Sequence, residues 1–220
     1  MQGINIELAR HNMVEQQVRP WDVLDQRVLD LIARSPRDEY VPARYRNVAY
    51  ADLFLPLGHG QTMLTPKLEA RMLQELEIGP KDRILEIGTG SGYFTSLLAA
   101  MGAHVYSVDI YSEFVDAAQA TLAAHGASNV TLETGDAARG WDKHGPYDVI
   151  AITGSMPVLP DAFLASLAPG GRLMAFIGKS PVMDAIRIRR LAGDGMEKTS
   201  IFETDVPALV NAYEPAKFVF

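Results

Sequence analysis

The sequence predicts an α/β fold built on a doubly wound, mostly parallel sheet, with antiparallel C-terminal strands and an N-terminal helical extension. Three observations carry this prediction. Helical and strand patterns alternate from residue 66 onward. An apolar strand at 84–87 runs directly into glycines at 88, 90 and 92. The apolar run at 147–153 is typical of a strand in a sheet that is covered on both faces.

The N-terminal part is predicted to be helical and then irregular. Residues 6–18 and 23–33 have the periodicity of amphipathic helices. Residues 35–66 are rich in Pro, Tyr and Gly and show no period. A loop of that length is unusual in a compact domain and is often a functional lid. We therefore divide the chain into an extension with a lid (1–66) and an α/β core (67–220), which together form one compact domain.

From residue 67 the pattern of turns and apolar runs sets each element in order. Gly79-Pro80 ends the first core helix and Gly126 ends the third. Helices are expected over 67–76, 92–101, 112–125 and 161–167. Strands are expected over 84–87, 103–109, 129–133, 147–153 and 172–177, and residues 183–220 read as further strands with turns at 193–195 and near Pro215.

The glycine turn after the first core strand favours a ligand that lies against bare backbone. Side chains at Gly88, Gly90 or Gly92 would block that approach. Glu86 lies just before the turn and would repel a pyrophosphate but not a cation. The turn therefore favours S-adenosylmethionine, which carries a positive sulfonium and no phosphate, over a dinucleotide. A tight connection without a ligand is the alternative, because such turns are common in α/β proteins.

Two further acids follow the next two strands. Asp109 ends the strand at 103–109, where a carboxylate can accept both ribose hydroxyls of a nucleoside. Its alternative role is to cap the helix that follows. Asp136 follows the third strand and is placed to contact the adenine amino group; alone, it would be a turn residue. Because ligands of open α/β sheets bind at the carboxyl ends of the strands, these positions are expected to converge.

Composition excludes several classes of function. The net charge is −7, and no Lys- or Arg-rich run is present, so nucleic-acid binding is not expected. The densest basic cluster, Arg187, Arg189 and Arg190, is expected on one exposed face of a late strand. Cysteine is absent and the five histidines show no metal-ligand spacing, so no metal is expected. No secretory signal and no apolar run of membrane-spanning length is visible, which favours a cytoplasmic protein.

The chain resembles the protein-L-isoaspartate O-methyltransferases over about residues 29–178. The resemblance rests on motifs in family order: Tyr40-Val41-Pro42, Gly58-His59-Gly60-Gln61-Thr62, Glu86-Ile87-Gly88-Thr89-Gly90-Ser91-Gly92-Tyr93, Gly135-Asp136, Gly140-Trp141, Pro146-Tyr147-Asp148 and Pro169-Gly170-Gly171. It implies a Rossmann-like class I methyltransferase fold, S-adenosyl-L-methionine as cofactor, and methylation of a carboxylate in damaged, isoaspartyl protein.

The acceptor side departs from the family pattern. The family loop Gly-Gln-Thr-Ile-Ser-Gln-Pro becomes Gly60-Gln61-Thr62-Met63-Leu64-Thr65-Pro66, so Leu64 replaces the serine beside donor and acceptor. The glycine after Gly-Asp is Ala137, and residues 154–158 replace an alanine-rich turn. The family ending Phe-Val-Pro-Leu has at best a remnant in residues 217–220. Two alternatives to isoaspartyl methylation therefore remain. The protein could methylate a different small-molecule or peptide acceptor, or it could bind the cofactor without catalysis.

The resemblance and the pattern together give the predicted site. A carboxylate acceptor is ionised at neutral pH and needs no base. Candidate catalytic residues are Thr62 as a hydrogen-bond donor, Thr65 as a substitute for the lost serine, and His59, which is otherwise a surface histidine. The predicted cofactor-binding residues are Met63, Leu64, Glu86, Gly88, Thr89, Gly90, Ser91, Gly92, Asp109, Ile110, Asp136 and Ala137.

Overall fold

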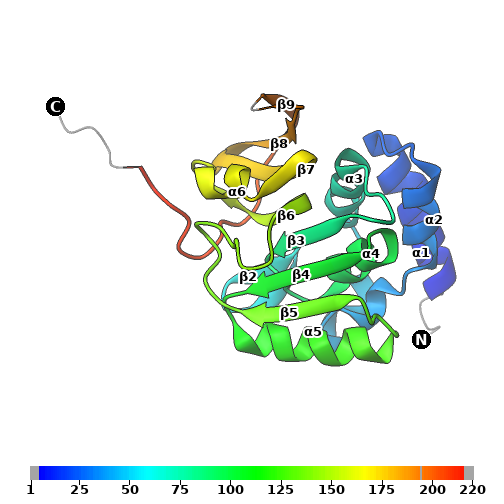
Figure 1. Cartoon of the computed structure of the whole chain (residues 1–220). Coiled ribbons are helices and arrows are strands. Elements are labelled where there is room, and N and C mark those ends of the chain that lie inside the picture. Colours follow the sequence, from blue (N-terminus) through cyan, green and yellow to red (C-terminus); the bar gives the residue numbers. More distant parts are fainter. Residues whose placement is uncertain (1–4, 194, 216–220) are drawn as a thin grey trace.

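A seven-stranded sheet forms the centre of the molecule (Figure 1). The structure is a computed structural model and describes residues 5–193 and 195–215. The strand order is β5-β4-β3-β6-β7-β8-β9. The first five strands in this order run parallel, and β8 and β9 are antiparallel, which confirms the predicted sheet. The strands are β3 (Arg83–Ile87), β4 (His104–Asp109), β5 (Val130–Thr134), β6 (Tyr147–Met156), β7 (Leu167–Lys179), β8 (Val182–Arg190) and β9 (Met196–Thr204).

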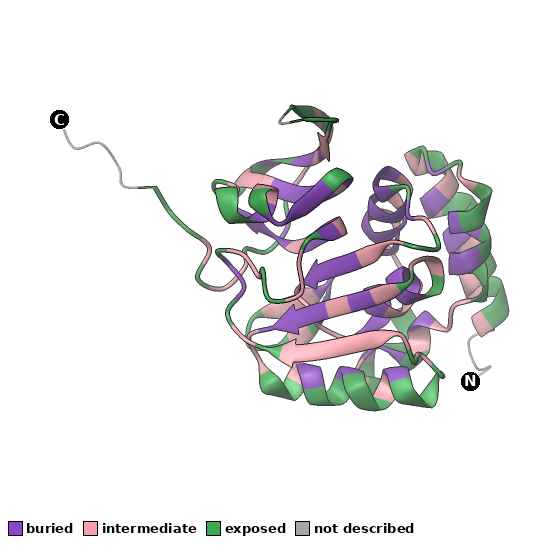
Figure 2. Cartoon of the chain, in the orientation of Figure 1, coloured by how far each residue is buried: buried purple, intermediate pink, exposed green. Residues whose placement is uncertain are grey.

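Helices cover both faces of the sheet. One face packs against a cluster that includes residues of α1 (Ile6–Met13), α2 (Gln26–Arg34), α3 (Pro66–Leu76), α4 (Tyr93–Met101) and α5 (Ser112–Ala124). The other packs against Phe163 of α6 (Asp161–Ala165) and against Trp141. Figure 2 shows the result: the central strands are mostly buried, while the outer side of α5 is exposed. A sheet covered on both faces explains the apolar run that predicted β6.

The first predicted helix is not continuous. After α1, the chain widens into a π-helical turn at Val14–Val18 and tightens into a 3-10 turn at Arg19–Trp21. Met13 and Val18, five residues apart, are both fully buried. A π turn places residues five apart on one face, so the wide turn buries both side chains. Pro20, which lacks an N–H, then ends the helix.

The segment expected to be irregular contains a short hairpin. After 3-10 turns at Arg37–Glu39 and Ala43–Val48, β1 (Leu55–Gly58) pairs antiparallel with β2 (Gln61–Met63). Both residues of its turn have positive φ, +50° at His59 and +73° at Gly60, as in a type I′ hairpin. The sequence hides this hairpin because the strands are very short and include Pro56 and Gly58.

The late strands also differ from expectation. β6 and β7 are longer than predicted, and α6 is shorter. The prediction that Arg187, Arg189 and Arg190 share one exposed face holds only in part: Arg187 and Arg189 lie on the same face, where both contact Glu77, but all three residues are only partly exposed. Arg187 pairs with Glu75, Arg189 pairs with Glu77, and Arg190 donates to the carbonyl of Leu167. These arginines therefore fasten β8 to the end of α3 and to β7.

Candidate functional site

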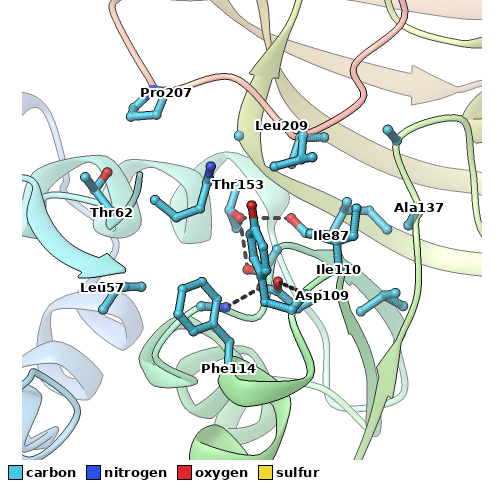
Figure 3. A pocket seen from close by; sticks show the side chains of 18 of the residues that line it. Leu57, Thr62, Ile87, Asp109, Ile110, Phe114, Ala137, Thr153, Pro207 and Leu209 are labelled. Carbon is cyan, nitrogen blue, oxygen red and sulfur yellow. Dashed lines mark hydrogen bonds between the residues drawn. The ribbon is translucent and has the colours of Figure 1, made fainter. Parts of the chain in front are cut away.

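The carboxyl ends of β3, β4 and β5 meet around one cavity, as the sequence predicted for the two acids and the glycine turn. Gly88 N donates to Val108 O (2.8 Å) and Gly135 N donates to Asp109 O (2.9 Å), which extends the strand ladder into the loops. The cavity holds about 680 Å³ including its open mouth, within the usual range of small-molecule sites. Figure 3 shows Asp109 between Ala137 on one side and Leu57 and Thr62 on the other.

Asp109 holds the glycine turn and also lines the cavity. Its Oδ2 accepts from Gly90 N (2.9 Å) and its Oδ1 accepts from Tyr111 N (3.1 Å). Burial raises the pKa of this carboxyl, and the backbone amides oppose the rise. An ionised carboxylate has about four acceptor positions. Asp109 can therefore bind the turn and still accept hydrogen bonds from hydroxyl groups of a ligand.

The glycine turn has no room for side chains. Gly88 has φ +96°, and a Cβ there would lie 2.2 Å from Thr153 Oγ1. That hydroxyl donates to the carbonyls of Ile87 (2.9 Å) and Gly88 (3.0 Å), so it cannot move away freely. Gly90 has φ +52°, and its Cβ would lie 3.1 Å from Leu57 Cδ1. Both glycines line the cavity, which leaves bare backbone facing a ligand.

Glu86 lies beneath the turn and outside the cavity lining. The side chain is fully buried, and Thr95 Oγ1 donates to its Oε2 (2.5 Å). Burial raises the pKa of Glu86 to about 8, while the hydroxyls of Ser107 and Thr95 oppose that rise. Most of this carboxyl is therefore protonated at neutral pH. It contacts the helix that follows the turn, and the structure does not bring it to the cavity wall.

The remaining residues of the predicted cofactor set lie in three places. Ile110 and Ala137 line the main cavity. Thr89 and Ser91 line a smaller neighbouring cavity, and Gly92 precedes the first residue of α4. Asp136 lines the main cavity; its Oδ1 accepts from Ala138 N (3.1 Å), and its Oδ2 accepts from Asn211 Nδ2 (2.8 Å).

The loop at residues 59–65 divides its side chains between cavity and core. Thr62 and Leu64 line the main cavity, and Met63 lines only the smaller one. Thr65 lines neither cavity and stands directly before the first residue of α3. His59 also lies outside both linings, where its ring stacks on Tyr111 at 4.1 Å between centroids.

Sequence reasoning missed the segment that closes the cavity from above. Residues 205–210, which we call the C-terminal strap, cross the end of β6, where Ser155 forms a bridge with Ala208. Ser155 Oγ donates to Val206 O (2.7 Å) and Leu209 N donates to Ser155 O (2.9 Å). A Cβ at Gly154 would lie 2.7 Å from Leu209 Cδ2. The Gly154-Ser155 pair is thus the one local signal for this crossing.

Charge in the main cavity is of one sign. Asp109 and Asp136 line it, and among the described residues no Lys, Arg or His does. The opposite wall is apolar, formed by residues of the hairpin and the strap: Leu57, Leu64, Val206, Pro207, Leu209 and Val210. Such a lining suits a ligand with net positive charge and disfavours phosphates.

Neither a metal-ligand cluster nor a membrane-spanning helix occurs among the described residues. Within residues 5–193 and 195–215, no group of three or more His, Cys, Asp and Glu is arranged to hold a metal ion. In the same part of the chain, no helix has the length and apolar character needed to cross a bilayer.

Comparison with known proteins covers nearly the whole chain. The family model described as Protein-L-isoaspartate(D-aspartate) O-methyltransferase (PCMT) matches residues 9–208. The protein-L-isoaspartate O-methyltransferase of Koribacter versatilis is 37% identical over 212 residues, covering 96% of this chain and 95% of that protein. A relative named protein-L-isoaspartate O-methyltransferase 1, from Anaeromyxobacter sp. (strain Fw109-5), is 40% identical over 197 residues, covering 89% and 90%.

Solved structures agree in fold. A Plasmodium falciparum structure, described as a putative enzyme of this kind in complex with S-adenosyl-L-homocysteine, aligns with a TM-score of 0.80 at 19% identity. The alignment covers 94% of this chain and 99% of that chain. This likeness confirms the Rossmann-like class I methyltransferase fold. The family match ends just after Val206-Pro207, so it reaches the strap, whereas the proposed remnant at 217–220 lies outside the described residues.

Proposed function

Because this chain belongs to the protein-L-isoaspartate O-methyltransferase family, whose members use S-adenosylmethionine, we propose that it methylates the side-chain carboxylate of isoaspartyl residues in damaged proteins or peptides. One observation carries the proposal: a single cavity runs from the strand tips at Gly88, Asp109 and Asp136 to the loop residues Thr62 and Leu64. Donor and acceptor sites would then share one enclosed space.

The residues of this cavity suit the cofactor. When bound, S-adenosylmethionine supplies a methyl group on a positively charged sulfur. Asp109 would accept the ribose hydroxyls, the backbone at Gly88 and Gly90 would approach the methionine part, and Asp136 with Ala137 would contact the adenine. Two facts favour this assignment: among the described residues the lining carries carboxylates and no basic side chain, and Gly88 and Gly90 present backbone without side chains to the cavity.

The chemistry asked of the protein is positioning rather than proton transfer. An acceptor carboxylate is already ionised at neutral pH, and the cavity wall offers no histidine or lysine among the described residues. The Thr62 hydroxyl is buried, and no hydrogen-bond partner for it occurs within the described part of the chain. It can donate to an acceptor oxygen. The hairpin and the strap would exclude water and align the acceptor, which can supply much of the rate.

The division of the chain follows from this function. Residues 1–66 would form an extension whose last part covers the acceptor end, and residues 67–220 the core that holds the cofactor. We place the enzyme in the cytoplasm, with an isoaspartyl protein or peptide as its partner.

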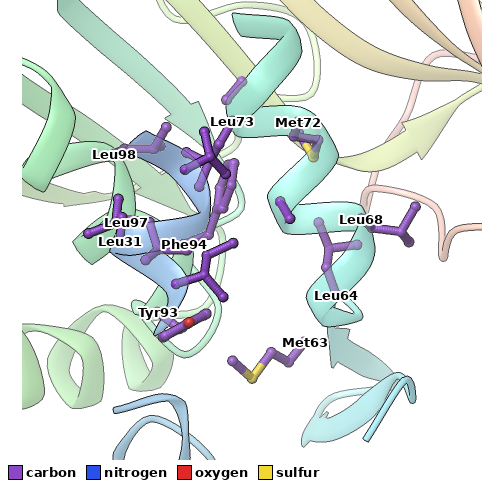
Figure 4. Close-up of a cluster of buried hydrophobic side chains, with 14 of the residues drawn as sticks. Leu31, Met63, Leu64, Leu68, Met72, Leu73, Tyr93, Phe94, Leu97 and Leu98 are labelled. Carbon is purple, nitrogen blue, oxygen red and sulfur yellow. The ribbon is translucent and has the colours of Figure 1, made fainter. Parts of the chain in front are cut away.

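A second candidate function rests on Leu64. This residue is 6% exposed and lies where the family loop carries serine, within an apolar cluster next to the cavity (Figure 4). An apolar acceptor wall favours methylation of a different, less polar acceptor on the same scaffold. Leu64 also leads to a third candidate function, that of a sensor protein that binds the cofactor but no longer transfers its methyl group.

Methyl transfer to paired peptides tests the proposal. The purified protein is incubated with methyl-labelled S-adenosylmethionine and either an isoaspartyl peptide or the same sequence with ordinary aspartate. We expect base-labile methyl ester on the isoaspartyl peptide only. Binding of S-adenosylhomocysteine without any ester would reject the isoaspartyl function and leave the two alternatives.

A further inference from the structure

A buried carboxylate that neither the motifs nor the resemblance marked lies at the methionine end of the site. A smaller cavity adjoins the main one, with which it shares Leu57, Thr62, Leu64, Gly88, Gly90 and Thr153. Glu69 of α3 lines this smaller cavity and is 2% exposed. Among the described residues that line it, Glu69 is the one charged side chain.

Arg37 fixes the position of Glu69. This arginine is fully buried, and its Nη1 pairs with Glu69 Oε2. Its Nε donates to Ala49 O (2.8 Å) and its Nη2 donates to Leu64 O (2.5 Å). The guanidinium carbon lies 4.9 Å from the ring centre of Tyr93. All three nitrogens of Arg37 are therefore engaged, and one of them holds the loop that lines the acceptor end.

We propose that Glu69 is a cofactor-binding residue that accepts the α-ammonium group of S-adenosylmethionine, and that Arg37 is the positioning residue that aims it. The inference deepens the proposed function and rests on it. Glu69 stands beside the glycine turn at Thr89, Gly90 and Ser91, where the methionine part of the cofactor is assigned.

The charges support a role in binding over a role in packing alone. A buried ion pair usually contributes little to stability compared with apolar residues of similar volume. Here the pair stands at a cavity wall. Together the two cavities are lined by Glu69, Asp109 and Asp136, and no basic side chain of the described residues faces either. The cofactor carries a sulfonium, an ammonium and one carboxylate, so its net positive charge complements these acids.

The protonation of Glu69 agrees with a cationic partner. Burial raises the pKa of Glu69 to about 7, although Arg37 opposes the rise. The charge of Glu69 in turn contributes to the raised pKa of the buried acid Glu86. An ammonium group facing Glu69 would favour its ionised form.

A comparison of two ligands on two proteins tests the proposal. S-adenosylhomocysteine carries the ammonium group, whereas 5′-methylthioadenosine lacks the amino-acid part. We expect Glu69→Gln to weaken binding of S-adenosylhomocysteine at least tenfold in titration calorimetry and to change binding of 5′-methylthioadenosine less than twofold. Glu75→Gln is the matched control, because Glu75 is a buried acid of the same helix that pairs with Arg71 and Arg187 away from both cavities.

Each other outcome is decisive. An equal loss of affinity for both ligands would show that Glu69 has a purely structural role, and would overturn the proposal. Tighter binding of S-adenosylhomocysteine to Glu69→Gln would also overturn it, because Glu69 would then face the ligand carboxylate. A wild-type protein that binds neither ligand overturns the proposed function as well. If Glu69→Gln does not fold, the apolar pair Arg37→Met with Glu69→Leu replaces it. The same selective loss is then expected, and retained preference for S-adenosylhomocysteine overturns the assignment.

Discussion

The two halves of the cavity are built differently. Gly88 and Asp109 stand at the ends of β3 and β4, where the parallel ladder continues into the turns. The other half consists of the β1–β2 hairpin and the strap at residues 205–210, which an isolated bridge at Ser155 joins to the sheet. The sheet-borne half carries its residues on a rigid frame. The loop-borne half depends on side-chain packing. Substitutions there can therefore change which acceptor fits without disturbing the sheet.

The halves also differ in charge. The sheet-borne half carries the carboxylates of Asp109 and Asp136. The loop-borne half is mostly apolar, and Thr62 supplies its buried hydroxyl. Substitutions in the first half should therefore change stability and cofactor binding, whereas those in the second should change transfer to the acceptor.

The largest effect is expected at Glu86, as a change in how stability depends on pH. In the folded protein its pKa is raised to about 8 from 4.5, so the unfolded chain loses this proton first as pH rises. Wild-type stability should fall between pH 5 and pH 9, by an amount on the order of a few kcal/mol. Glu86→Gln should make that slope clearly shallower without abolishing it, because Glu69 still titrates, as measured by urea unfolding at pH 5, 7 and 9.

Subtraction isolates the Glu86 contribution. Glu69 and Asp109 also have raised pKa values and titrate in both proteins, so the difference between wild type and Glu86→Gln reports this carboxyl. Parallel slopes in the two proteins would show that Glu86 is ionised in the folded state and that its burial is compensated.

Asp109→Ala tests the sheet-borne half for binding. The substitution removes the acceptor for Gly90 N and Tyr111 N and for the ribose hydroxyls. Hydrogen bonds to a charged group contribute about 1.5–3 kcal/mol each, so affinity for S-adenosylhomocysteine should fall about 100-fold. Calorimetry measures this, with Asp116→Ala on the exposed side of α5 as control. An Asp109→Ala affinity within threefold of wild type would remove Asp109 from the cofactor site.

The same division explains what the sequence could predict. The strands, the glycine turn and Asp109 follow from local patterns, because a strand that runs into glycines and then an acid determines its own geometry. The hairpin was missed because its strands are three and four residues long. The strap was missed because its contacts are with residues far away in the sequence: Val206 contacts Ser155, about fifty positions earlier, and Met183.

Arg37 and Glu69 show a further limit of sequence analysis. They are 32 residues apart, and nothing near either residue marks it as buried. Charged residues are almost never fully buried unless paired, so the expectation for each alone is an exposed side chain. Only the packing of the segments around Arg37, Ala49 and Leu64 against α3 brings the pair to the cavity.

Leu64→Ser tests the loop-borne half. The substitution restores the hydroxyl of the family loop beside donor and acceptor. We expect affinity for S-adenosylhomocysteine to stay within threefold and kcat on an isoaspartyl peptide to rise about tenfold, the factor that about 1.4 kcal/mol of transition-state stabilisation gives. Because Leu64 is buried, stability should fall by about 2–4 kcal/mol, so assays need a temperature well below the melting point. Leu64→Ala has the same cavity without the hydroxyl and is the control.

The smallest effect is expected at His59. Substituting this residue tests whether it is a catalytic base or only supports the cavity wall. Its ring stacks on Tyr111, a cavity residue, and its Nε2 lies 3.8 Å from Glu113 Oε1. General-base catalysis contributes about 10²–10⁴-fold, whereas loss of a stacking ring next to the cavity should lower kcat less than threefold. His59→Asn tests this, because asparagine tolerates the positive φ at this position. A drop of 100-fold in this variant would instead mean that the loop-borne half supplies a proton acceptor, and would make His59 a catalytic residue.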